Sequence, residues 1–246
     1  MWFSRTSLAL FGTTLVLAAC QPELNPLPPA PTPVVWQVEI TPALRWLGPV
    51  FKQCTAEQPG INLVLSEYSA AYPESGSVDF SFQWGERKAP AGFTAVMARE
   101  ELAVIVHPSN PNGTLQMDDL RGLYSAQADR WKGPSSACPS CTAGFDGPVQ
   151  SYGYALGEDV QAAADWIQAG PRTWLAPDPA AVLQAVANDP YAIGYVPAHW
   201  VDPTVKRVKL EGIALGPVQQ PVLVSAAAEP QGSQRSWLLC VQEKLR

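Results

Sequence analysis

Apolar and polar positions alternate in several short segments of this chain, and these segments predict its strands. The first covers 34–40 and reads Val-Val-Trp-Gln-Val-Glu-Ile, with β-branched residues at most of its apolar positions. Such a pattern is typical of a strand that buries one face. The same criteria predict strands over 61–65, 78–83, 93–98, 102–106, 149–154, 193–196, 205–210 and 221–225.

Other segments have the three-to-four-residue spacing of a helix. Thr41-Pro42 favours a helix start, because Thr is a common N-cap and Pro fits the first helical position. Apolar residues then recur at helical spacing as far as 58, where Pro59-Gly60 ends the pattern. Further helices are predicted over 114–124, 159–169, 179–188 and 233–245. This order indicates an α/β fold with a mostly parallel sheet flanked by helices.

The segment 1–19 is predicted to be a signal peptide. Arg5 precedes an apolar run over 8–17, which is too short for a permanent membrane span and ends in small residues. The sequence Leu17-Ala-Ala-Cys20 resembles the bacterial lipobox, in which the cysteine carries the lipid. We therefore predict a lipoprotein that lies outside the cytoplasm and is anchored to the bacterial membrane through Cys20. An ordinary signal peptide with an incidental cysteine is the alternative.

A proline-rich tether is predicted at 20–33, since six of residues 21–33 are proline. Proline fixes φ and lacks an N–H, so the folded part is expected to begin near Val34. The remaining chain is long enough for one large domain or two lobes. Hydrophobic residues make up 47% of the sequence and the formal net charge is −6. These values allow a large core and argue against nucleic-acid binding.

Besides Cys20, the chain has four cysteines, and four cysteines allow three pairings. The simplest is Cys54 with Cys240, on two predicted helices, and Cys138 with Cys141, in one loop. A redox or zinc site at the Cys138–Cys141 motif is the alternative. The sequence has no second motif of this kind, and neither of its two histidines has a ligand-like spacing to it. We therefore predict no metal and no cofactor.

Two passages resemble one known family. The first, 102–131, contains His107-Pro-Ser-Asn-Pro111, a helix with spaced leucines and then Trp131, although Ala126 stands where glycine is usual. The second, 192–212, contains Ile193-Gly-Tyr195. Both, together with the last helix, resemble the phosphate-binding-protein-like branch of type 2 periplasmic solute-binding proteins. These proteins serve ABC transporters.

The resemblance implies two α/β lobes, each a mostly parallel sheet flanked by helices, joined by two crossing strands. Lobe 1 would cover 34–103 and 200–246, and lobe 2 would cover 104–199. The implied function is delivery of a small solute, such as phosphate or another oxyanion, to the permease of an ABC-type importer. The alternative is a non-transport envelope lipoprotein that uses the same fold for protein interaction or signalling.

The resemblance also implies where a ligand would bind. The corresponding turns of this chain contain Thr41, Ser66, Tyr68, Ser69, Ser81, Tyr154 and Gly157. The relatives begin a helix of lobe 2 with Ser-Gly-Thr-Arg, whereas this chain has Tyr-Ala-Leu-Gly-Glu-Asp at 154–159. The arginine and both hydroxyls are missing there, and Glu67 would repel an anion if it faced the cleft. Another oxyanion, a small organic solute or no solute therefore stay open.

Catalysis is not predicted. The sequence lacks the nucleophile-elbow, zinc-protease and phosphate-loop patterns. Two pairs of adjacent carboxylates, Glu100-Glu101 and Glu158-Asp159, are expected to be solvated. Thr41 and Ser81 also have simple structural explanations, as a helix cap and a strand end.

Overall fold

The structure is a computed structural model that describes residues 33–71, 78–86, 92–133, 138–212 and 218–245. The predicted signal peptide, Cys20 and most of the tether lie outside these residues. Within the described part of the chain, no helix is long and apolar enough to cross a membrane.

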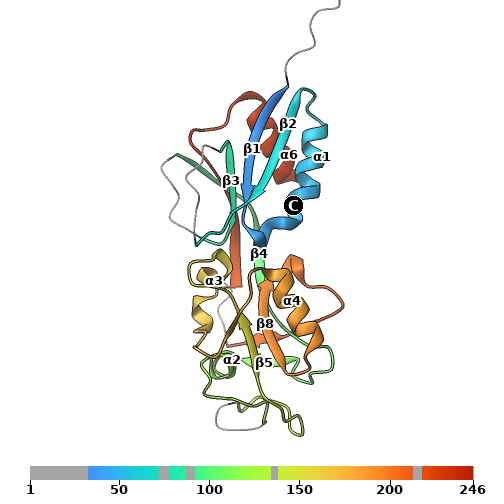
Figure 1. The fold of residues 1–246 in the computed structure, drawn as a ribbon, viewed down its shortest axis with the longest axis vertical. Helices are drawn as coiled ribbons and strands as arrows, with labels where there is room; N and C mark the ends of the chain where they lie inside the picture. Colours follow the sequence, from blue (N-terminus) through green and yellow to red (C-terminus); the bar gives the residue numbers. More distant parts are fainter. Residues whose placement is uncertain (1–32, 72–77, 87–91, 134–137, 213–217, 246) are drawn as a thin grey trace, which may run out of the picture. The chain divides into compact units, whose positions relative to one another are not determined.

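The first sheet combines strands from both ends of the folded chain (Figure 1). β1 (Val34–Ile40) lies between β2 (Ile61–Glu67) and β3 (Phe80–Trp84) and is parallel to both. β11 (Gln219–Ala226) follows β3 and is antiparallel to it and to β4 (Phe93–Val106). β1, β2 and β3 are therefore parallel to one another, and β11 runs in the opposite direction between β3 and β4.

β4 is shared by two sheets. Its first part, as far as Glu101, pairs with β11 except at Met97, where the register shifts, and its last five residues, from Leu102, pair with β8 (Ala192–Pro197). The sequence predicted two strands here, because Arg99-Glu-Glu101 interrupts the apolar pattern. The structure has one strand of 14 residues instead. The polar residues pair with Gln219, Gln220 and Pro221 of β11, so the ladder continues through them.

The second sheet extends from β8. β6 (Gln150–Gly153) is parallel to β8 and to β7 (Trp174–Leu175), while β9 (Lys206–Arg207) is antiparallel to β4. The fold is therefore a two-lobed α/β fold, and the pairing partner of β4 changes between Glu101 and Leu102. The lobe boundaries given above stay a prediction.

A small separate sheet corrects one predicted helix start. The helix predicted from 114 begins at Met117 as α2 (Met117–Tyr124). The three residues before it form β5 (Thr114–Gln116), which is parallel to β10 (Lys209–Glu211). Local propensity at 114 is overridden by this long-range pairing.

Two other predicted helices are shorter than expected. The helix predicted over 41–58 is a 3-10 helix, η1 (Pro42–Leu47), followed by α1 (Gly48–Ala56). That predicted over 159–169 is α3 (Asp159–Ala163) followed by η2 (Asp165–Ile167). The remaining helices are α4 (Pro179–Asn188), η3 (Ala198–Trp200) and α6 (Gly232–Lys244).

The core of the first lobe is aromatic. The Trp237 ring of α6 is fully buried and stacks on Phe80 at 5.5 Å between ring centroids. It also lies within 6.2 Å of the rings of Trp36, Phe51 and Phe82. The same helix is joined to α1 by the disulfide Cys54–Cys240, and a second disulfide joins Cys138 to Cys141. The C-terminal helix is thus tied to the first lobe by both packing and a covalent bond.

Ala126 has the backbone conformation for which glycine is the usual residue. It follows α2 with a φ of 63°, in the left-handed region that favours glycine. An alanine there stores backbone strain of about 1 kcal/mol or more.

We therefore expect Ala126→Gly to raise the free energy of unfolding by about 0.5–1 kcal/mol, the relief of strain being partly offset by the more flexible unfolded chain. Urea unfolding followed by circular dichroism measures this change. Ala143→Gly is the matched control, because Ala143 is exposed and its φ is not positive. It should lower stability by a similar amount, and equal losses in both variants would contradict the strain at Ala126.

Candidate functional site

A crevice between the two lobes is the candidate site. It encloses a cavity of about 310 Å³. Its described lining residues are Ala70, Ala71, Trp84 and Glu86 from the first lobe and Gly157, Asp159 and Ala162 from the second. A larger cavity of about 410 Å³ lies along β4 and β10, where Glu101 and Arg207 form an ion pair with each other. The crevice is the better candidate because Gly157, one of the residues predicted to bind a ligand, lines it, whereas none of those residues is among the described lining of the larger cavity.

Asp159, the first residue of α3, spans this crevice. Its Oδ2 accepts a hydrogen bond of 3.2 Å from the backbone N–H of Trp84, at the end of β3 in the opposite lobe. Its Oδ1 accepts one of 2.8 Å from the N–H of Val160. Asp159 is only 9% exposed, so a carboxylate expected to be solvated is buried.

The electrostatics of Asp159 reflect this burial. Removal from water raises the pKa of the Asp159 carboxyl to about 6, and the neighbouring Glu158 charge adds to the rise. The Thr41 hydroxyl and the two N–H groups oppose it. Thr41 is fully buried, and its hydroxyl makes no hydrogen bond of ordinary geometry. It therefore faces the carboxylate from the turn after β1.

Two further contacts join the same turn of the second lobe to the first. The Ser69 hydroxyl donates a hydrogen bond of 2.6 Å to Glu158 Oε1. Gly157 has a φ of +93°, and a Cβ placed on it would lie 3.2 Å from the Cβ of Ala71. The turn at 157–159 therefore contacts the first lobe through a glycine and two carboxylates.

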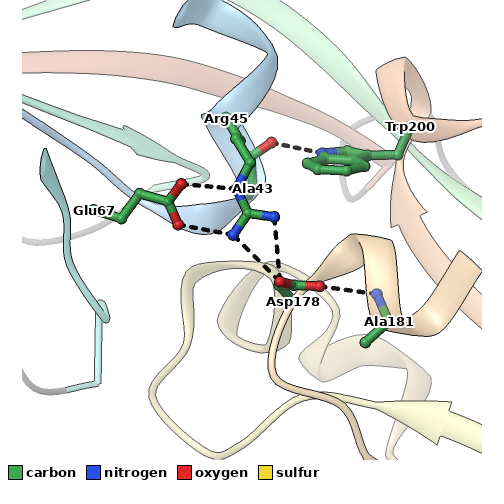
Figure 2. A network of polar contacts seen from close by, with 6 residues as sticks. All are labelled: Ala43, Arg45, Glu67, Asp178, Ala181 and Trp200. Atoms are coloured by element: carbon green, nitrogen blue, oxygen red, sulfur yellow. Dashed lines mark hydrogen bonds and ion pairs between the residues drawn. The ribbon is translucent and has the colours of Figure 1, made fainter. Parts of the chain in front are cut away.

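A charged network joins the lobes at another point (Figure 2). Arg45 of η1 binds both oxygens of Glu67, at 2.7 and 2.8 Å. The same guanidinium lies 3.3 Å from Asp178, whose other oxygen caps α4 at Ala181. Glu67 is therefore paired with a cation, and that charge is neutralised locally. The Trp200 indole donates to the Ala43 carbonyl at 2.8 Å beside this network.

Glu100, at the centre of β4, is the second carboxylate that was expected to be solvated and is not. It accepts hydrogen bonds from the Trp84 indole Nε1 at 3.0 Å and from the His199 backbone N–H at 2.6 Å. Burial raises the pKa of the Glu100 carboxyl to about 7, against these two hydrogen bonds. Trp84 is therefore held by a carboxylate at its backbone and by another at its ring.

Comparison with solved structures identifies the fold. A phosphate ABC transporter substrate-binding protein from Clostridium perfringens, with bound phosphate, matches with a TM-score of 0.67 and 15% identity, over 85% of this chain and 93% of that one. A phosphate transport receptor from Vibrio cholerae matches with a TM-score of 0.60 and 14% identity, over 85% and 93%. The chain has the type 2 periplasmic-binding-protein fold.

The periplasmic-binding-protein fold is also used by regulators. The regulatory domain of MetR, a LysR family regulator from N. meningitidis, matches with a TM-score of 0.59 and 13% identity, over 85% of this chain and 93% of that one. No protein-family model matches the sequence. No curated protein is significantly similar to it. At these identities, the similarities establish the fold of the chain and do not identify its ligand.

The structure brings together only some of the residues predicted to bind a ligand. Thr41, Ser69 and Gly157 lie at the crevice contacts. The Ser81 hydroxyl donates to the Tyr68 hydroxyl at 3.1 Å within the first lobe, and Ser66 is exposed on β2. Tyr154 is 3% exposed and donates to the Tyr195 carbonyl, so it packs in the second lobe. Thr41 is the N-cap residue of η1, as predicted, although its side chain makes no capping hydrogen bond.

Arg45, Glu158, Asp159 and Asp178 were not singled out as site residues. The acidic signal at 158–159 was visible in the sequence, at the predicted start of a helix. Only the packing of α3 against β3 brings it to Trp84.

Substitution of Gly157 tests how closely the lobes approach. We expect Gly157→Ala to lower the free energy of unfolding by about 2–3 kcal/mol, because it combines a left-handed φ with a contact to Ala71. Gly60→Ala is the control, since Gly60 has a φ of +88° and open space around it. It should cost about 1 kcal/mol. Equal losses measured by urea unfolding would show that the lobes do not meet at Gly157.

The raised pKa of Glu100 predicts a pH dependence. The Glu100 carboxyl binds a proton more tightly in the folded protein than in the unfolded chain. Protonated Glu100 therefore stabilises the fold at low pH, and this stabilisation is lost as pH rises through about 7. Between pH 6 and pH 8.5, we expect Glu100→Gln to gain about 1 kcal/mol relative to the wild type. Urea unfolding at both pH values measures this relative change. An unchanged difference between the two proteins would contradict the assignment.

Proposed function

We propose that the chain is a solute-binding lipoprotein outside the cytoplasm that delivers a small solute to an ABC-type importer. The observation that carries this proposal is the crevice of about 310 Å³, to which both lobes contribute side chains. A solute held there would contact both halves of the molecule, and its binding would favour the closed arrangement of the lobes. Closure of this kind is a signal that a permease can recognise.

The lipid anchor is the second part of the proposal and rests on the sequence alone. The segment Leu17-Ala-Ala-Cys20 and the proline-rich tether would hold the folded part near the membrane surface. Membrane permease subunits would then lie within reach of the lobes.

The crevice favours a solute other than a free oxyanion. Glu86 and Asp159 line its cavity and Glu158 lies at its edge, so its described charged groups are negative. Arg45 is already shared by Glu67 and Asp178. The phosphate bound by the Clostridium perfringens protein is thus a poor guide to the ligand of this chain, and a small organic solute without a negative charge fits the crevice better.

A non-transport role is the second candidate, and one observation favours it. Polar contacts already join the two lobes at Arg45–Asp178, Ser69–Glu158 and Trp84–Asp159. A protein whose lobes are held together by its own side chains would present a fixed surface to a protein partner. Co-purification of permease subunits would support import, and that of a sensor would support the alternative.

Calorimetric titration of the purified protein tests solute binding. We expect no heat of binding with phosphate or sulfate, and micromolar binding of at least one small compound without a negative charge from a panel of sugars, amides, polyols and amines. Ala162→Trp should abolish that binding, because Ala162 lines the crevice. Gln184→Trp, on an exposed position of α4, should preserve it. The absence of binding throughout the panel would contradict a receptor function.

A further inference from the structure

We propose that the Asp159 carboxylate is an internal anion, which occupies an anion-binding position between the lobes and excludes external oxyanions from it. The exclusion deepens the proposed receptor function and rests on it. The occupation of the position by Asp159 does not, because it would hold equally in a non-transport protein.

The first support is the set of donors. The Trp84 N–H comes from the end of β3 and the Val160 N–H from the start of α3. These segments are far apart in the sequence and belong to both lobes. They converge on one carboxylate, which supplies all the negative charge that the position needs.

The second support is the absence of a counter-ion. Among the residues that the structure describes, no lysine or arginine forms an ion pair with Asp159, and its charged neighbour Glu158 has the same sign. Burial of a charge without a cation is costly unless hydrogen bonds compensate for it. Uncharged donors alone hold this carboxylate, and a group of convergent N–H and O–H donors can bind a free anion in the same way.

The third support is the buried Thr41 hydroxyl. It is fully buried and has no hydrogen bond of ordinary geometry, yet it influences the carboxylate beside it. Burying a hydroxyl without a hydrogen bond lowers the stability of the folded protein. Its presence is explained if it faces a position that an anion fills.

The consequence for an external oxyanion is twofold. The carboxylate fills the space in front of the donors, and Glu158, bound to Ser69 at the same edge, adds a second negative charge. Phosphate would have to displace one carboxylate and approach another. Specificity against oxyanions therefore follows from a residue of the chain itself.

Removing the side chain should convert the internal anion into a site for an external one. In Asp159→Gly the donors remain and the carboxylate is gone, so formate should bind in its place. We expect the melting temperature of this variant to rise by about 3–5 °C at a formate concentration ten times the dissociation constant. Chloride at equal ionic strength should give no such rise. The wild type should not respond to formate.

Asp165→Gly is the matched control, because it removes an exposed carboxylate at the start of η2, six residues along the chain. It should not respond to formate. If Asp159→Gly does not fold, Asp159→Ser leaves similar space with a less flexible backbone and should show the same formate effect. A folded variant without a formate-specific rise, or an equal rise in the wild type, would overturn the proposal. The solute titration has a separate readout, so either proposal can fail alone.

Discussion

The hydrogen-bond ladder of β4 is the constraint on which the two-lobed arrangement depends. One strand of 14 residues pairs with β11 in the first sheet and with β8 in the second. Its polar centre cannot lie in either core, so it lies where the lobes meet. Glu100 is at this point and binds groups from two different elements. The geometry of the crevice therefore begins with the backbone of a single strand.

Around this strand, three carboxylates of the second lobe also contact the first lobe. Asp159, Glu158 and Asp178 each reach an amide, hydroxyl or guanidinium group of the first lobe. Their partners differ in strength: the Arg45 pair is half exposed and contributes little on its own, whereas the Asp159 bond is buried. Three acidic residues of the second lobe thus lie where it contacts the first.

Much of the fold could be predicted from the sequence because local patterns determine it. The strand at 34–40 and the helix at 179–188 have the predicted bounds. Apolar alternation determines the strand, and the Asp178 N-cap fixes the start of the helix. The pairing of β5 with β10, and the continuity of β4 through three polar residues, depend on partners about a hundred residues away. The site was predicted only in part for the same reason: the hydrogen-bond partner of Asp159 in the first lobe is the N–H of Trp84, at the end of β3.

The place of β11 in the first sheet has a consequence for biogenesis. β11 lies between β3 and β4, although it is the last strand among the residues that the structure describes. The sheet therefore has a gap at its centre until the C-terminal segment arrives, and the second lobe is synthesised before the first is finished. During synthesis, the edges of β3 and β4 that face this gap therefore stay unpaired until residues 219–226 have been made.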